Sequence, residues 1–241
     1  MKLSLTHEPA RSPKAAPRRA PRTALIVDLT CRGAPAIAHR LAREGYALVL
    51  GHAPACTDAA RTVSAITFAG GCARAVSIES SGEAEISRLL DLAARIFGGV
   101  DVVINNAREP VGGEADPADT VFDRYFGACH RGMLHGLNAA ALRLAAGSRI
   151  VNLPAAADEA SVTDSAAYLT PTAALARLTG RFAEALVPRG LIVNAIAASA
   201  HCDEAAIAEA VAMLVGADAD GCNGELFDVD ALIPRDAGVS A

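Results

Sequence analysis

The chain has 241 residues and a mass of 24.6 kDa, with 52% hydrophobic residues, only 4% aromatic residues and a formal charge of −5. A chain of this length buries a sizeable core without disulfides or metals, and the composition excludes collagen-like and wholly disordered proteins. Lysine occurs only at Lys2 and Lys14. Chemistry that needs a lysine ammonium therefore cannot be performed by residues 23–241.

Residues 1–22 differ from the rest in charge and in proline content. They hold six bases, one acid and four prolines, a charge of +5, which leaves −10 for the remaining residues. A basic, proline-rich stretch without apolar periodicity is typical of a solvated, disordered tail. A transit peptide and an arm that docks onto an acidic partner are the alternatives, and the acidic remainder argues against nucleic-acid binding. We expect a tail over 1–22 and one domain over 23–241.

Two further features concern the location of the protein. No run reaches the roughly 18 apolar residues that a membrane-spanning helix needs. The six cysteines are scattered without C-x-x-C spacing, which argues against zinc ribbons and thioredoxin-like sites. Since a secretory signal is also missing, we expect reduced thiols in a cytoplasmic protein without a membrane span or a metal site.

From residue 23 onward, short apolar runs alternate with helical segments. Buried strands that alternate with amphipathic helices predict right-handed crossovers and a parallel sheet covered on both faces. The sequence therefore predicts an α/β fold with one doubly wound parallel sheet. In chain order the predicted elements are strand 24–27, helix 36–44, strand 47–50, helix 57–69, strand 73–78, helix 86–97, strand 100–104, helix 119–146, strand 149–153, helix 166–187, strand 190–196, helix 203–215 and strand 226–229.

Four motifs follow one another along these elements: Asn105-Asn106-Ala107 after the fourth strand, Tyr168 at the start of a long helix, Val193-Asn194-Ala195-Ile196-Ala197 in the sixth strand, and the segment 224–230. In their order and spacing they resemble the short-chain dehydrogenase/reductase family over about residues 23–235. The resemblance implies a single Rossmann-fold domain that uses NADP or NAD. It also implies a homo-oligomer built through helices 119–146 and 166–187.

The dinucleotide-binding turn of that family, T-G-x-x-x-G-x-G, corresponds to residues 27–34. Asp28, Arg32 and Ala34 stand at its three glycine positions. Glycine there lets backbone N–H groups approach a diphosphate, so the usual cradle is altered. Asp28 adds negative charge, whereas Arg32 offsets that charge or holds a phosphate with its side chain. By resemblance the cofactor-binding residues are Thr30, Arg32, Gly33, Glu79, Asn105 and Ala107, and weak or absent cofactor binding is expected.

The catalytic residues of the family are matched only at Tyr168. Its lysine position is Thr172, its serine position is Ala155 and its asparagine position is Cys129. A tyrosine hydroxyl ionises near pH 10 in water, and a nearby cation is needed to lower that value. Thr172 supplies none, so efficient carbonyl reduction through Tyr168 is not expected.

The connection after the sixth predicted strand is also short, because the next helix is predicted to begin at residue 203. The family places a longer lid there, which closes the site and excludes water. His201 and Cys202 in this connection are interpreted as loop residues, with a nucleophilic pair as the alternative.

Three hypotheses for the function follow from these residues. The first is a degenerate family member with weak or no dehydrogenase activity, acting as a binding, regulatory or partner subunit. The second is an active NAD(P)-dependent reductase of a carbonyl or pterin-like substrate that uses Tyr168 with an atypical cofactor mode. The third gives the function to the basic tail, which would dock an inert domain onto an acidic protein partner.

Overall fold

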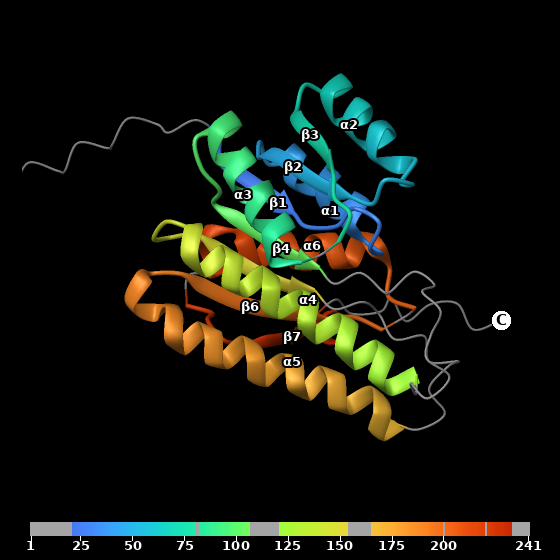
Figure 1. Cartoon of the computed structure of the whole chain (residues 1–241), viewed down its shortest axis with the longest axis vertical. Coiled ribbons are helices and arrows are strands. Elements are labelled where there is room, and N and C mark those ends of the chain that lie inside the picture. Colours follow the sequence, from blue (N-terminus) through green and yellow to red (C-terminus); the bar gives the residue numbers. More distant parts are fainter. Residues whose placement is uncertain are drawn as a thin grey trace, which may run out of the picture.

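The structure is a computed structural model that describes residues 21–80, 82–106, 121–153, 165–199, 201–219 and 221–232. Side chains are described for these residues except 121–130, 165–172, 218, 231 and 232. Within the described chain, seven parallel strands form one sheet in the order β3-β2-β1-β4-β5-β6-β7 (Figure 1). The predicted doubly wound α/β fold is therefore confirmed.

The elements alternate along the chain as the sequence predicts. The strands are β1 Thr23–Ile26, β2 Ala47–His52, β3 Cys72–Ser77, β4 Val102–Asn106, β5 Arg149–Leu153, β6 Ile192–Ala197 and β7 Leu226–Asp228. The helices are α1 Ala34–Arg43, α2 Asp58–Phe68, α3 Glu83–Phe97, α4 Val121–Arg143, α5 Ser165–Leu186, α6 Glu204–Val215 and α7 Val229–Leu232, with the 3-10 turns η2 Val187–Arg189 and η3 Ala217–Ala219.

Helices cover both faces of the sheet. One apolar cluster joins α1, α2 and α6 to one face, and a second joins α3, α4 and α5 to the other. Figure 1 shows α3, α4 and α5 side by side on one face. Every residue of β1, β4 and β5 is buried between these layers. This double burial explains why the strands are continuous aliphatic runs rather than alternating ones.

Two strands begin later than predicted. β4 begins at Val102 rather than at 100, because the carboxylate of Asp101 turns back to accept a hydrogen bond from the N–H of Thr23 at 2.8 Å. β6 begins at Ile192 rather than at 190, because Gly190 has a φ of +67° and ends the preceding 3-10 turn. Both differences are local and leave the order of the strands unchanged.

The chain order of the strands creates a topological switch point beside β1. From β1 the chain builds outward through β2 and β3, then returns to β4 on the other side of β1. In open α/β sheets, ligands bind outside the carboxyl ends of the strands at such a switch point. The β1–α1 turn, the end of β4 and the β6–α6 connection all lie at this carboxyl edge.

Membrane-spanning helices and metal sites were searched for over the described residues. No described helix is long and apolar enough to cross a membrane. Over the same residues, no group of three or more His, Cys, Asp or Glu side chains is arranged to hold a metal ion. Most of the predicted 1–22 tail lies outside the described residues, so the tail stays a prediction.

Candidate functional site

The turn between β1 and α1 is built around the buried carboxylate of Asp28, which has no exposed surface. Its Oδ1 accepts hydrogen bonds from the backbone N–H of Thr30 at 2.9 Å and from the hydroxyl of Thr30 at 2.6 Å. The backbone carbonyl of Asp28 accepts a hydrogen bond from the N–H of Cys31 at 3.4 Å. Several polar groups of the turn are thus bonded within the protein, and the Asp28 side chain stands at its centre.

The rest of the turn is shaped by two glycines. Gly33 precedes α1 with a φ of +77°, in the left-handed region that favours glycine. Gly51 in β2 lies so close to the turn that a Cβ there would sit 2.1 Å from the carbonyl oxygen of Val27. The carbonyl of Gly51 in turn accepts a hydrogen bond from the N–H of Leu29 at 2.7 Å. Residues of β2 therefore help to set the path of the turn.

The two asparagines at the end of β4 are both bonded inside the protein. The side-chain oxygen of Asn106 accepts from the N–H of Asp28 at 2.9 Å, and its amide donates to the carbonyl of Asp28. Asn105 donates to the carbonyl of Met133 at 2.9 Å and to the side-chain oxygen of Asn152 at 2.8 Å. Asn106 thus ties the turn to β4, and Asn105 ties β4 to β5 and to α4.

The network beyond Asn105 extends into α5. Asn152 of β5 donates to the hydroxyl of Thr179 at 3.1 Å, and both side chains are fully buried. A Cβ at Gly136 of α4 would lie 1.9 Å from the side-chain oxygen of Asn105. A glycine is therefore required there for the asparagine to fit. A buried polar network of this kind holds its elements in one arrangement because every unmade bond is costly.

Arg32 reaches from the turn to the β6–α6 connection. Its Nη1 donates to the carbonyl of Ser199 at 3.0 Å, and its Nη2 donates to the carbonyl of Cys202. The N–H of Ser199 donates to a carboxylate oxygen of Asp230 at 3.2 Å, and the N–H of Cys202 donates to the carbonyl of Ser199 at 3.1 Å. The connection is thus held from one side by Arg32 and from the other by α7.

Comparisons with known proteins agree with this architecture. A family model described as Enoyl-(Acyl carrier protein) reductase matches residues 34–206. The chain belongs to the short-chain dehydrogenase/reductase family. An uncharacterized oxidoreductase of Methylorubrum extorquens is 32% identical to it over 162 residues, which is 67% of this chain and 65% of that protein. 3beta-hydroxysteroid dehydrogenase 1 of Eggerthella lenta is 32% identical over 178 residues, 68% of this chain and 65% of that protein.

Solved structures of this family share the fold. A short-chain dehydrogenase/reductase of Serratia marcescens has a TM-score of 0.72 at 26% identity, covering 86% of this chain and 95% of that one. A short-chain dehydrogenase of Burkholderia cenocepacia, solved in complex with NADP, has a TM-score of 0.72 at 24% identity, covering 88% and 98%. The chain spans only 61% to 65% of the length of the curated relatives that it matches.

The catalytic positions implied by the short-chain dehydrogenase/reductase resemblance fall on α4 and α5. Tyr168 and Thr172 both lie in α5, one turn apart on one face, and Cys129 lies in α4. Their side chains are outside the described part of the structure, as are Ala155 and the cofactor-binding candidate Ala107. Their predicted roles stay predictions.

The other cofactor-binding candidates that the structure describes lie along the carboxyl edge of the sheet. Thr30 is exposed on the turn, Gly33 is buried beneath it, and Glu79 is exposed just beyond the end of β3. Arg32 is directed to the β6–α6 connection, and the amide of Asn105 is bonded in the interior. The structure thus gathers the turn residues at one edge, but it uses two of the candidate side chains inside the protein.

Sequence reasoning missed Asn152, Thr179 and Asp230 as parts of this edge. An asparagine in the apolar run of β5 is a signal that could have found Asn152, because a buried amide needs hydrogen-bond partners. Nothing in the sequence signals the bonds of Arg32, whose partners lie 167 and 170 positions away.

Cys202 is a buried residue of the β6–α6 connection. Burial is the main cause that raises the pKa of its thiol, and the negative charge of Asp230 raises it further. His201, its neighbour, is exposed. A raised thiol pKa reduces the thiolate that a nucleophilic cysteine needs, so these features favour the loop interpretation.

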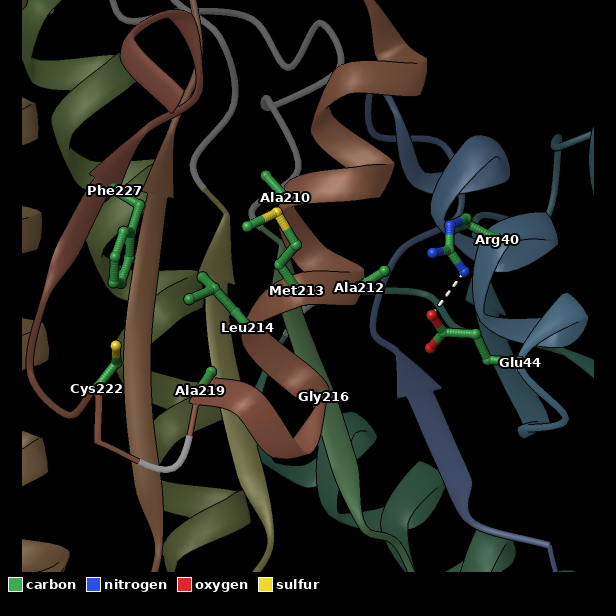
Figure 2. A pocket seen from close by; sticks show the side chains of 10 residues that line it. All are labelled: Arg40, Glu44, Ala210, Ala212, Met213, Leu214, Gly216, Ala219, Cys222 and Phe227. Atoms are coloured by element: carbon green, nitrogen blue, oxygen red, sulfur yellow. Dashed lines mark hydrogen bonds and ion pairs between the residues drawn. The ribbon is translucent and has the colours of Figure 1, made fainter. Parts of the chain in front are cut away.

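A cavity of about 410 Å³ lies elsewhere, around the C-terminal half of α6 (Figure 2). Because helices run opposite to parallel strands, the C-terminal halves of α1 and α6 lie toward the amino edge of the sheet. The cavity is therefore separate from the turn that the family uses for its cofactor. Its lining residues are Arg40, Glu44, Ala210, Ala212, Met213, Leu214, Gly216, Ala219, Cys222 and Phe227.

Proposed function

We propose that this chain is a short-chain dehydrogenase/reductase family member with weak or no dehydrogenase activity, acting as a binding, regulatory or partner subunit. The observation that carries the proposal is the buried carboxylate of Asp28 at the centre of the β1–α1 turn. Family members have glycine at this position, and the diphosphate of their cofactor accepts hydrogen bonds from the backbone N–H groups of the turn.

The electrostatic argument concerns an anion brought to this turn. Two like unit charges about 5 Å apart repel by about 3 kcal/mol at an effective dielectric constant near 20. A helix N-terminus attracts an anion by only about 1 kcal/mol. The repulsion from Asp28 therefore outweighs the attraction of the α1 N-terminus. The one cation within the turn, Arg32, is already bonded to the carbonyls of Ser199 and Cys202. As the turn stands, its residues do not fit a dinucleotide diphosphate.

The catalytic positions support the same proposal. Tyr168 is matched by sequence, but Thr172 and Ala155 stand where the family has its lysine and serine. Without a cation beside it, a tyrosine hydroxyl holds its proton too tightly to exchange it efficiently with a substrate oxygen near neutral pH. No lysine elsewhere in residues 23–241 substitutes for the missing one.

The proposed role as a subunit rests on the outer surface of α5. Ala176 and Gly180 form a shallow hollow there, bordered by Arg177 and by the ion pair of Arg181 and Glu184 at 3.0 Å. Small residues let another helix approach closely, so we place the homo-oligomer interface on α4 and α5. Light scattering of Arg177→Glu, at the border of the hollow, should show a smaller assembly than the wild type, whereas the matched charge reversal Arg95→Glu on the exposed side of α3 should leave the assembly unchanged.

The competing function is an NAD(P)-dependent reductase of a carbonyl or pterin-like substrate. It is favoured by the similar proteins, which include a hydroxynaphthalene reductase-like protein and a hydroxysteroid dehydrogenase, and by a similar structure solved in complex with NADP. The two functions differ in whether the wild-type chain binds a nicotinamide cofactor.

A titration with NADPH and NADH separates the two functions. Calorimetry or nicotinamide fluorescence should show a Kd weaker than about 1 mM for the wild type. Micromolar binding would contradict the proposal and favour the reductase. In that case Thr172→Lys combined with Ala155→Ser should raise turnover of a carbonyl substrate. Thr170→Lys, two residues from Tyr168 and on another face of α5, is the control that adds charge without the pairing.

A further inference from the structure

The cavity of about 410 Å³ beside α6 is not used by the candidate site at the carboxyl edge of the sheet. Seven of its ten lining residues have apolar side chains, and its two charged residues, Arg40 and Glu44, lie together on the α1 side (Figure 2). Small-molecule sites in proteins are concave, mostly apolar and about 300–1,000 Å³ in volume. The cavity therefore has the size and composition of a site for a small, largely apolar molecule.

The apolar surface of the cavity comes from α6, from β7 and from the segment that joins them. Met213 is 61% exposed and Phe227 is partly exposed, so both apolar side chains meet water. Ala210 and Ala219 leave room beside them, because each side chain is a single methyl group. Covering Met213 and Phe227 with an apolar ligand is favourable, and the flexible methionine adapts to the shape of its partner.

The wall of the cavity between α6 and β7 is fixed by two buried polar side chains. Arg149 donates to the carbonyls of Leu214 and Ala219, both at 3.3 Å. Asn194 donates to the carbonyl of Cys222 at 2.9 Å. All three acceptors belong to residues that line the cavity. Because these bonds set its shape in advance, little ordering is needed when a ligand binds.

The charged groups on the α1 side favour an uncharged ligand. Arg40 donates from Nη1 to Glu44 at 2.6 Å and from Nε to Glu209 at 2.7 Å. The guanidinium charge is thus matched by carboxylates, so an anion meets repulsion from them and a cation must compete with Arg40 for them. Nη2 of Arg40 has no hydrogen-bond partner in the described part of the chain. Its N–H groups can only donate, so a hydroxyl or carbonyl oxygen of a ligand suits them.

We propose that this cavity binds an uncharged aliphatic molecule with one hydroxyl or carbonyl oxygen. The aliphatic chain lies against Met213 and Phe227, and the oxygen accepts a hydrogen bond from Nη2 of Arg40. The site goes beyond the proposed function, because it lies toward the amino edge of the sheet and shares no residue with the β1–α1 turn or with the catalytic positions. Binding there is therefore independent of NADPH or NADH.

1-Octanol is the probe for the full chain, and the methyl groups of isotope-labelled methionine report its binding by NMR. Met213 lines the cavity, whereas Met133 is buried elsewhere, in a cluster with Leu175. The Met213 signal should shift and saturate, and the Met133 signal should not move. Each methylene added from 1-butanol to 1-octanol should tighten binding by about twofold to fourfold. A Met213 signal that does not move, or an affinity that is independent of chain length, would overturn the proposal.

Cys222 gives a second readout, because it also lines the cavity and is partly exposed. Bound 1-octanol should slow the alkylation of Cys222, followed by peptide mass spectrometry. The alkylation of Cys72 should not change, since Cys72 is exposed on β3, at the opposite edge of the sheet. Equal slowing of both thiols would contradict binding in the cavity.

Octanoate and octylammonium test the charge argument. Both should bind about tenfold more weakly than 1-octanol, because neither charged headgroup finds an unpaired partner. Equal or tighter binding of either one would overturn the uncharged ligand class. Arg40→Gln shortens the donor and should weaken 1-octanol binding by about threefold to tenfold. Arg43→Gln is the matched control on the same helix, since Arg43 does not line the cavity, and it should leave the affinity unchanged.

The apolar contact and the occupant are tested by further substitutions. Met213→Lys should weaken the protection of Cys222 by 1-octanol about tenfold, whereas Phe68→Lys, at a 95% exposed position on α2, should not. A second copy of the chain as the occupant would make the Met213 signal depend on protein concentration. Residues 1–20 as the occupant would make that signal move in Leu3→Ser combined with Leu5→Ser. Either result without the alcohol would overturn the proposal.

Discussion

Arginines hold both ends of α6, but their physical settings differ. At the C-terminal end Arg149, only 5% exposed, donates to the carbonyls of Leu214 and Ala219, both at 3.3 Å. Arg22 donates to the carbonyl of Val215 at 3.4 Å. The last carbonyls of a helix have no partners within the helix and form the negative end of its dipole. A cation there donates hydrogen bonds to these carbonyls and stabilises the helix.

At the N-terminal end Arg32 meets the opposite field. It lies beside two helix N-termini, and its carbonyl partners belong to the connection that precedes α6. The dipoles favour Arg149 and Arg22 and disfavour Arg32. The comparison teaches that the same bond between guanidinium and carbonyl lies in a favourable helix field at one end of α6 and in an unfavourable one at the other.

The largest expected effect is at the C-terminal end. Arg149→Met should lower the free energy of unfolding by about 3 kcal/mol, because it leaves two buried carbonyls without their charged donor. Urea denaturation measures the change. Arg189→Met is the control, since Arg189 is exposed and donates to one carbonyl, that of Leu144 at 3.1 Å. An equal loss in both variants would break the comparison.

The next effect is at the N-terminal end and concerns binding rather than stability. Asp28→Asn keeps an oxygen that can accept from Thr30 but removes the charge, so the affinity for NADPH should rise by about tenfold to a hundredfold. Calorimetry measures it. Asp101→Asn is the matched control, because Asp101 accepts from the N–H of Thr23 at the other edge of the sheet. An unchanged affinity for NADPH in Asp28→Asn, or an equal rise in Asp101→Asn, would contradict the charge argument.

A smaller effect is expected for the exposed arginine of the C-terminal end. Arg22 donates to Val215 and lies 5.0 Å from the centre of the Tyr46 ring, but its side chain is exposed to solvent. Arg22→Ala should lower the free energy of unfolding by at most about 1 kcal/mol, and high salt should reduce this difference. A loss as large as that of Arg149→Met would show that burial does not decide the strength of these contacts.

The smallest effect concerns the pH dependence of stability and His39, which lies within α1. Burial lowers the pKa of its imidazole below 6.5, and the positive charge of Arg43 lowers it further. The unfolded chain therefore binds a proton more readily, so stability is fully present above pH 6.5 and is lost as the pH falls through the folded pKa. His39→Gln should make this decline shallower in urea unfolding at pH 7 and pH 5. Arg43→Gln should do so in part; a steeper decline in either variant would contradict the assignment.

The sequence by itself determined the order of elements and the layered fold. Apolar runs such as β1 and β5 are buried on both faces, and helices with one apolar side cover them, so local periodicity carries the information. Most element ends were found within two residues, whereas α3 begins three residues before its predicted start and α4 ends three residues before its predicted end. Asp203 marks one end that was found, since its side chain accepts from the N–H of Ala205 at the start of α6.

The sequence also determined the residue types at the candidate site, because the positions of Asp28, Arg32, Tyr168 and Thr172 follow from motif spacing alone. It did not determine what those side chains contact. The N–H of Asp28 is bonded to the side-chain oxygen of Asn106, and the amide of Asn105 is bonded to Asn152 on the neighbouring strand. Such contacts join residues far apart in the chain, so no local pattern encodes them.

Only the tertiary structure decided the direction of Arg32. In the sequence it is a cation in a phosphate-binding turn; in the fold it bonds to two carbonyls 167 and 170 positions away. The reason is that a long, flexible side chain bonds to the acceptors that the packing of α1 against α6 brings within reach. Periodicity predicts which elements form, but the neighbours of a side chain depend on how those elements pack.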